Sequence, residues 1–123
     1  MKNDMTTLKP GPHGFHITFP DGFVLSCQYG IGNYCQNQDM GGSQNWDDHK
    51  SLGETATMEV AVMNPKGDFV VLEHDVAGWV PVGNLPQLME SIQAHDWDRV
   101  CLLCGETGEP DLAKFPEKGV DYA

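Results

Sequence analysis

Hydrophobic and polar residues alternate with a period of two from residue 15 to residue 29, which predicts two antiparallel β-strands. The residues expected on the buried face are Phe15, Ile17 and Phe19 in the first strand and Phe23, Leu25, Cys27 and Tyr29 in the second. A two-residue turn would put these two sets on opposite faces of the sheet. A three-residue loop over residues 20–22 pairs Phe19 with Phe23 and lets Gly22 adopt a positive φ, so we predict this loop.

A second pair of strands is expected from residue 55 onwards. The inward-facing residues of its first strand are Ala56, Met58, Val60 and Val62. The sequence "NPKGD", residues 64–68, is typical of a turn, because Pro65 fixes φ and Gly67 accepts a positive φ. The sequence "FVVLEH", residues 69–74, predicts the returning strand, and "DVAGWVPVGN", residues 75–84, predicts a connection.

Two further segments have helical periodicity. Residues 85–95 place Leu85, Leu88, Met89 and Ile92 on one stripe, after Asn84 as the expected N-cap and with Pro86 in the first turn. Residues 97–104 place Trp97, Val100, Cys101 and Cys104 on one stripe, between Asp96 as a cap and Gly105 as a stop. The second segment is also compatible with a short strand, because "RVCLLC" contains no internal polar residue.

Together these patterns predict an α+β fold. We expect a four-stranded antiparallel sheet, made of two hairpins joined by a long loop, with one or two C-terminal helices on one face. The 123 residues are enough to close one hydrophobic core. The expected organisation is a flexible N-terminal arm over residues 1–13, a single α+β domain over residues 14–105 and a mobile acidic tail over residues 106–123.

The chain is acidic, with 18 Asp and Glu against 7 Lys and Arg and a net charge of −11. Such a surface repels phosphate, so direct binding to nucleic acid or to an anionic membrane is not expected. A partner protein with a basic surface is favoured, including a surface that normally holds nucleic acid. The same charge also serves to keep a small protein soluble. No apolar run is long enough to span a membrane, and the first residues lack the apolar stretch of a signal peptide, so we expect the protein to stay where it is made.

The stretch "QYGIGNYCQNQDMGG", residues 28–42, leads from the second strand into a polar loop over residues 36–54. Its glycines lack the spacing, the following helix and the lysine of a phosphate-binding loop, so we interpret them as a sharp exit from the strand. A loop of this length is usually functional or disordered. Its tryptophan either folds back onto the domain or waits for a partner. The candidate partner-binding or ligand-binding residues are Asn33, Tyr34, Trp46, Asp47 and Asp48.

The four cysteines are Cys27, Cys35, Cys101 and Cys104, and we expect them to be reduced. Cys101 and Cys104 have zinc-ligand spacing, and the other two could complete a four-thiolate site. However, "CLLC" is apolar and Cys27 falls on the core face, so packing thiols are favoured and no metal or other cofactor is expected. The five histidines form no catalytic or metal-binding motif, so no enzyme activity is expected. A Cys–His pair that meets only in the fold stays open as an alternative.

Residues 15–35, "FHITFPDGFVLSCQYGIGNYC", resemble a family of small uncharacterised bacteriophage proteins. The matching positions are Phe19, Gly22, Ser26, Gln28, Gly30, Gly32, Asn33, Tyr34 and Cys35. Residues 54–70 are more weakly similar to the second hairpin of that family, and residues 94–123 lie outside the resemblance. The resemblance implies a phage origin, a location in the cytoplasm of the infected bacterium and an accessory role. In small phage proteins this role is often the inhibition of a host enzyme or defence system.

We therefore expect a small acidic phage-encoded binding protein that inhibits a host bacterial protein or defence system, in the manner of an anti-CRISPR protein. It would act by protein–protein contact, including competition for a basic surface that binds nucleic acid. Two alternatives belong to other classes. One is an oligomer that sequesters a small signalling nucleotide, and the other is a small zinc-binding structural protein.

Overall fold

The structure is a computed structural model that describes residues 5–30, 35 and 54–116. The described strands are β1 (Thr7–Pro10), β2 (Gly14–Thr18), β3 (Val24–Gln28), β4 (Thr57–Met63), β5 (Phe69–Val70) and β6 (Val76–Pro81). They form one antiparallel sheet and are followed by the helices α1 (Leu85–Gln93) and α2 (Trp97–Leu103). The predicted α+β class is confirmed, and the described sheet has more strands than the four that were expected.

The β2–β3 hairpin has the register that the hydrophobic alternation predicted. Ile17 lies opposite Leu25, and the backbone N–H of Phe19 donates to the carbonyl of Phe23 at 2.9 Å. Gly22 has a φ of +94°, a conformation that costs glycine little because it has no Cβ. The three-residue loop therefore keeps the large apolar side chains of both strands on one face.

The returning strand of the second hairpin differs from the prediction. It was expected over residues 69–74, but β5 ends at Val70, because Val71 has a φ of +75° and turns the chain out of the sheet. The chain returns as β6, which pairs with β4 on the same side as β5. The predicted connection over residues 75–84 therefore contains a strand, and β4 lies between β3 on one side and β5 with β6 on the other.

The segment expected to be a flexible arm, residues 1–13, also contributes a strand. β1 pairs with β2 in antiparallel register, with Leu8 opposite Ile17. All four residues of β1 are exposed, so it adds backbone hydrogen bonds to the sheet edge and little to the core. Residues 1–4 lie outside the described part.

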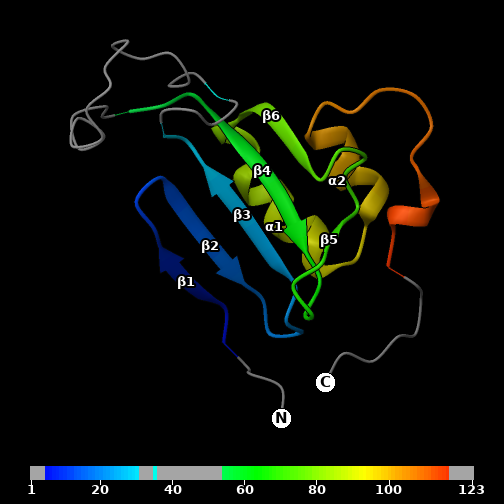
Figure 1. The fold of residues 1–123 in the computed structure, drawn as a ribbon, viewed down its shortest axis with the longest axis horizontal. Helices are drawn as coiled ribbons and strands as arrows, with labels where there is room; N and C mark the ends of the chain where they lie inside the picture. The colour runs from blue at the N-terminus through cyan, green and yellow to red at the C-terminus, as the bar shows by residue number, and fades with distance from the viewer. Residues whose placement is uncertain (1–4, 31–34, 36–53, 117–123) are drawn as a thin grey trace.

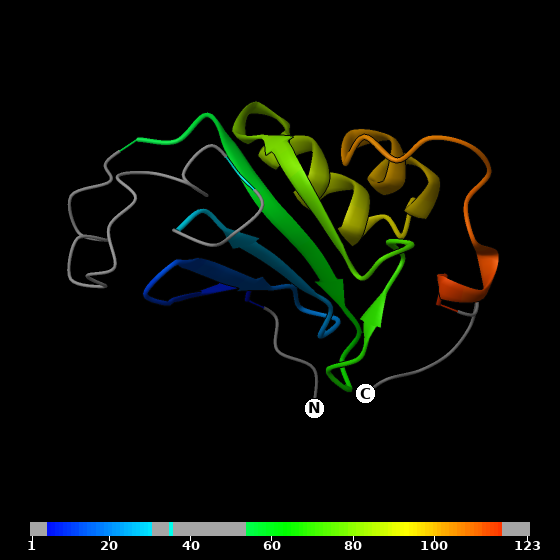
Figure 2. The same cartoon turned by 45° about the horizontal axis from the view of Figure 1, so that its top comes forward.

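Both helices cover the same face of the sheet, as Figures 1 and 2 show from two directions. The buried core between the two layers combines Ile17, Leu25, Cys27, Val60 and Val62 from the sheet with Leu88, Ile92, Trp97 and Val100 from the helices. The predicted stripes of both helices are confirmed, since their residues are buried in this core or partly buried against it. Residues 97–103 are helical, which decides between the two conformations that the sequence left open.

The helix ends agree only in part with the expected caps. The Asp96 carboxylate accepts a hydrogen bond from the Arg99 N–H at 3.3 Å, and Gly105 ends α2 with a φ of +78°. The Asn84 side chain does not cap α1; its Nδ2 donates to the Leu103 carbonyl at 2.9 Å instead. Asn84 therefore ties the start of α1 to the end of α2.

Residues 106–116 were expected to be part of a mobile tail, but they fold back on the domain. A short 3-10 helix over Leu112–Lys114 is capped by Asp111, and Phe115 packs against the core. The N–H of Val71 donates to the Lys114 carbonyl at 2.7 Å. Within the described residues, no helix is long and apolar enough to cross a membrane.

Candidate functional site

The most unusual exposed side chain in the described part is Trp79, in the middle of β6. The pairing of β6 with β4 shifts between Val60, which lies opposite Ala77, and Met58, which lies opposite Val80. Two residues, Gly78 and Trp79, therefore stand opposite the single residue Glu59, which is a β-bulge. Ala77 and Val80 are buried at 8% and 1% exposure, whereas Trp79 is 53% exposed. The bulge thus directs a large aromatic side chain away from the core.

The backbone of Trp79 is in the left-handed region, with a φ of +52°. A residue with a Cβ pays about 1–2 kcal/mol for this conformation, and glycine pays much less. A glycine, Gly78, stands next to it, yet the tryptophan occupies the costly position. Strain of this kind persists only where the surrounding pairing enforces it, and it is often found at functional positions.

A second strained segment lies just before β6, where the chain leaves and re-enters the sheet. Val71 and Asp75 have φ values of +75° and +68°. The C-terminal segment holds this crossover in place. Glu106 Oε1 accepts a hydrogen bond from the Glu73 N–H at 2.9 Å, and Lys114 Nζ forms an ion pair with Asp75. This support keeps β6, and with it the bulge, in its position on β4.

The chain segments around β6 are acidic. Glu54 precedes β4, Glu59 faces the bulge, and Glu73 and Asp75 precede β6. Lys114 is the described basic residue next to this group, and it is already paired with Asp75. The other basic residues of the described part are Lys9 in β1, Lys66 in the β4–β5 turn and Arg99 in α2. The described segments that adjoin β6 thus carry more acidic than basic residues.

The four cysteines are buried and form no disulfide. Burial raises the pKa of Cys27 and of Cys104 to about 12, and burial with the neighbouring Glu106 does the same for Cys101. Cys35 is not part of the core cluster that contains the other three, and its Sγ lies 3.8 Å from the Gly30 carbonyl. Among the described residues, no group of three His, Cys, Asp or Glu side chains is arranged to hold a metal ion. Cys27, Cys101 and Cys104 are therefore protonated at neutral pH, and a protonated thiol is a weak nucleophile.

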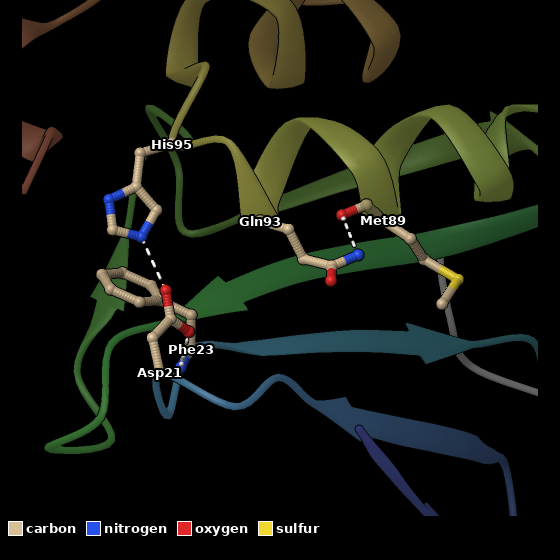
Figure 3. A network of polar contacts seen from close by, with 5 residues as sticks. All are labelled: Asp21, Phe23, Met89, Gln93 and His95. Atoms are coloured by element: carbon tan, nitrogen blue, oxygen red, sulfur yellow. Dashed lines mark hydrogen bonds and ion pairs between the residues drawn. The ribbon is translucent and has the colours of Figure 1, made fainter. Parts of the chain in front are cut away.

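In the part of the chain that the structure describes, a histidine–carboxylate pair joins the loop of the first hairpin to the connection from α1 to α2 (Figure 3). His95 Nε2 lies 2.7 Å from Asp21 Oδ2, and Asp21 Oδ1 accepts a hydrogen bond from the Phe23 N–H at 3.1 Å. The imidazole also stacks on Trp97, with ring centroids 5.0 Å apart. Both carboxylate oxygens are engaged, so the pair fastens the sheet to the helices.

A shallow hollow on the outer side of α1 is lined by Pro86, Met89, Glu90, Gln93 and Ala94. Two of these residues, Met89 and Gln93, are drawn in Figure 3, where the Gln93 amide donates to the Met89 carbonyl at 3.1 Å. The amide that could orient a ligand is therefore bonded to its own helix. All the lining residues come from one helix and its end, so the hollow lacks the converging polar groups of a ligand site.

The structure does not test the residues that the sequence singled out. Asn33, Tyr34, Trp46, Asp47 and Asp48 lie outside the described residues, so their role stays a prediction. Trp79 was missed because "DVAGWVPVGN" was interpreted as a connection. The available signal was a glycine inside a run of β-branched and aromatic residues, which is typical of a bulged strand.

In comparisons with protein families, with curated proteins and with solved structures, nothing matches this chain. Its function must therefore be argued from its own residues.

Proposed function

We propose that the protein is a small acidic binding protein that docks on a basic surface of a host bacterial protein and has no catalysis of its own. The observation that carries this proposal is Trp79, half exposed on a bulged strand in a strained conformation. Tryptophan, tyrosine and arginine are enriched among the few side chains that supply most of the binding energy of an interface.

The energy balance at Trp79 supports a binding role. The left-handed backbone costs about 1–2 kcal/mol, and only part of the indole is buried to offset that cost. An anchor that becomes fully buried on binding gains the energy of that burial in the complex.

The charge supports the choice of partner. A net charge of −11 favours association with a basic protein surface and disfavours nucleic acid and anionic lipid. Docking on such a surface would inhibit a host protein that uses it to hold nucleic acid. The phage origin, the action against a host defence system and the location in the bacterial cytoplasm belong to this proposal through the resemblance of residues 15–35.

The experiment is a paired affinity purification from nuclease-treated bacterial lysate, with the parent chain and Trp79→Ala immobilised side by side. We expect host proteins that bind the parent chain at physiological salt and are depleted by Trp79→Ala. A recovered partner is then purified, and its complex with the parent chain is challenged with nucleic acid. Recovery of the same proteins on both chains, or of none on either, would refute the proposal.

A further inference from the structure

We propose that the outer edge of β1 pairs with β1 of a second copy of the chain, so that two sheets join in an antiparallel dimer. β1 is the outermost strand on its side of the sheet, as Figures 1 and 2 show. Within the described residues, no strand pairs with its outer side. Self-association goes beyond the proposed function and does not depend on it.

The hydrogen-bond pattern of the sheet determines which backbone groups of β1 point outward. The Gly11 N–H donates to the Gly14 carbonyl at 2.8 Å, so Gly14 and every second residue after it in β2 exchange hydrogen bonds with the first strand. By the register of the two strands, the residues of β1 that take part are Lys9 and Thr7. The N–H and the carbonyl of Leu8 therefore point away from the sheet.

These outward groups fit a second copy of the same strand. With a two-fold axis at Leu8, the Leu8 N–H of each chain donates to the Leu8 carbonyl of the other. Thr6, directly before β1, can donate its N–H to the Pro10 carbonyl of the second copy. Pro10 has no N–H, but its nitrogen faces outward, where proline is tolerated in an edge strand. Lys9 lies opposite Thr7 of the second copy, so the two lysines are not directly opposed.

The Leu8 side chain gains burial in such a dimer. It lies opposite Ile17, which is part of the core, so it is on the same face of the sheet as the helices. Leu8 is 58% exposed, whereas Ile17 is 5% exposed. In the dimer the two Leu8 side chains become direct cross-strand neighbours and extend the apolar row that begins with Ile17. Their contact removes apolar surface of both copies from water.

The charge distribution makes this edge the most accessible one for a second acidic copy. β1, β2 and β3 contain no Asp or Glu, and their one basic residue is Lys9. Apart from Asp21, every acidic residue of the described part lies at residue 54 or later. Two chains of charge −11 repel each other, and at physiological salt this repulsion is screened over about 8 Å. The repulsion is therefore weakest where few acids are close.

The opposite side of the sheet is less suited to pairing. β5 has two residues, and the pairing of β6 is interrupted by its bulge. Short and bulged edge strands are poor templates for a further strand. In the strand order, β2, β3 and β4 lie between β1 and β6, so a dimer formed at β1 leaves β6 uncovered in both copies.

The test is the molar mass of the full chain in solution, measured by sedimentation over a wide range of concentration at low and high salt. The paired segment is short, so we expect a weak dimer whose fraction rises with concentration. High salt should strengthen it, because salt screens the repulsion between the two acidic chains. Amide hydrogen exchange tests the register. Raising the protein concentration should slow exchange at Leu8, whereas Thr7 and Lys9, which are bonded to β2, should change little.

Two lysine variants make a matched pair, because each replaces an exposed leucine, Leu8 at 58% and Leu102 at 74% exposure. Leu8→Lys should weaken the dimer at least about tenfold, although the added positive charge lowers the net repulsion. Leu102→Lys should change the dissociation constant of the dimer less than about threefold. Leu8→Pro removes the outward N–H without removing a bond to β2, so it should abolish the dimer. Circular dichroism confirms that each variant is folded.

A parent chain that stays monomeric up to about 1 mM would overturn the inference. A dimer that both Leu8 variants leave intact would overturn it too, since another surface would then hold the copies together. If the parent chain is monomeric and Leu8→Pro abolishes capture of a host protein, the edge receives a strand of that protein and not a second copy. None of these results changes the effect of Trp79→Ala in the affinity purification, so the two proposals can fail separately.

Discussion

Raising the pH from 8 to 10 should destabilise the protein through its buried thiols. Burial raises the pKa of Cys27 from 9.0 to about 12, and burial with nearby negative charge does the same for Cys104. Between pH 9 and pH 12 both thiols are mostly neutral in the folded protein, whereas they are mostly ionised in the unfolded chain. Their contribution to stability is therefore complete below pH 9 and is lost as the pH rises towards 12.

The size of the effect follows from these values. At pH 10 an unfolded thiol with a pKa of 9.0 is mostly ionised, which favours unfolding by about 1.4 kcal/mol for each thiol. Cys27 and Cys104 together should lower the free energy of unfolding by about 3 kcal/mol between pH 8 and pH 10. A domain of this size typically has about 5–15 kcal/mol in total, so the change is measurable.

The assay is urea unfolding followed by circular dichroism, with a reductant present, for the parent chain and for Cys27→Val and Cys104→Ala. Each variant has its own stability at pH 8, so only the change between pH 8 and pH 10 is compared. Each variant should lose about 1.4 kcal/mol less than the parent chain. An equal loss in parent and variants would refute the reasoning. Destabilisation of the parent chain by a chelator at pH 8 would point to metal-bound thiolates instead.

Three further predictions concern the fold. Gly14→Ala should cost about 3 kcal/mol or more in thermal or urea unfolding, because the added Cβ would lie 2.0 Å from a carbonyl oxygen of β3. Leu88→Ala should lower the free energy of unfolding by about 2–5 kcal/mol. The same change at Leu102, which is 74% exposed, should alter the free energy of unfolding by no more than about 0.5 kcal/mol. Similar losses at both positions would contradict the packing of the helices. Asp21→Asn should lower the free energy of unfolding by less than about 1 kcal/mol in the same assay, because the contact between Asp21 and His95 is largely exposed to solvent.

The elements with regular burial could be predicted from the sequence. In the first hairpin every second residue faces the core, so the pattern determined both the strands and the register of Ile17 with Leu25. In α2 the stripe from Trp97 to Cys104 combined with the Asp96 cap and the Gly105 stop. In both elements the burial pattern and the residues at the ends of the element indicate the same structure, which is why the sequence predicts these elements correctly.

The missed elements lack that regularity. All residues of β1 are exposed, so no alternation marks it, and it is held by backbone pairing alone. In β6 the core residues Ala77 and Val80 are three positions apart, because the bulge inserts Gly78 and Trp79 between them. This spacing fits neither a regular strand nor a helix of this length. The same bulge exposes Trp79. The bulge is therefore both the reason why the strand was missed in the sequence and the origin of the candidate site.

The candidate residues chosen from the sequence and from the structure belong to different segments. Tyr34 and Trp46 were chosen because aromatic side chains in polar loops often bind partners. Trp79 stands out only once its exposure and backbone conformation are known. A Trp46→Ala variant in the same affinity purification would show whether the loop contributes to binding as well.

The central claim is that Trp79 anchors a complex with a basic host protein. The most direct test is the dissociation constant of the purified partner for the parent chain and for Trp79→Ala, measured by calorimetry at physiological salt. The account predicts that the substitution weakens binding at least about 30-fold, as for a central anchor, while the variant remains folded. A dissociation constant within about twofold of the parent value would contradict the account.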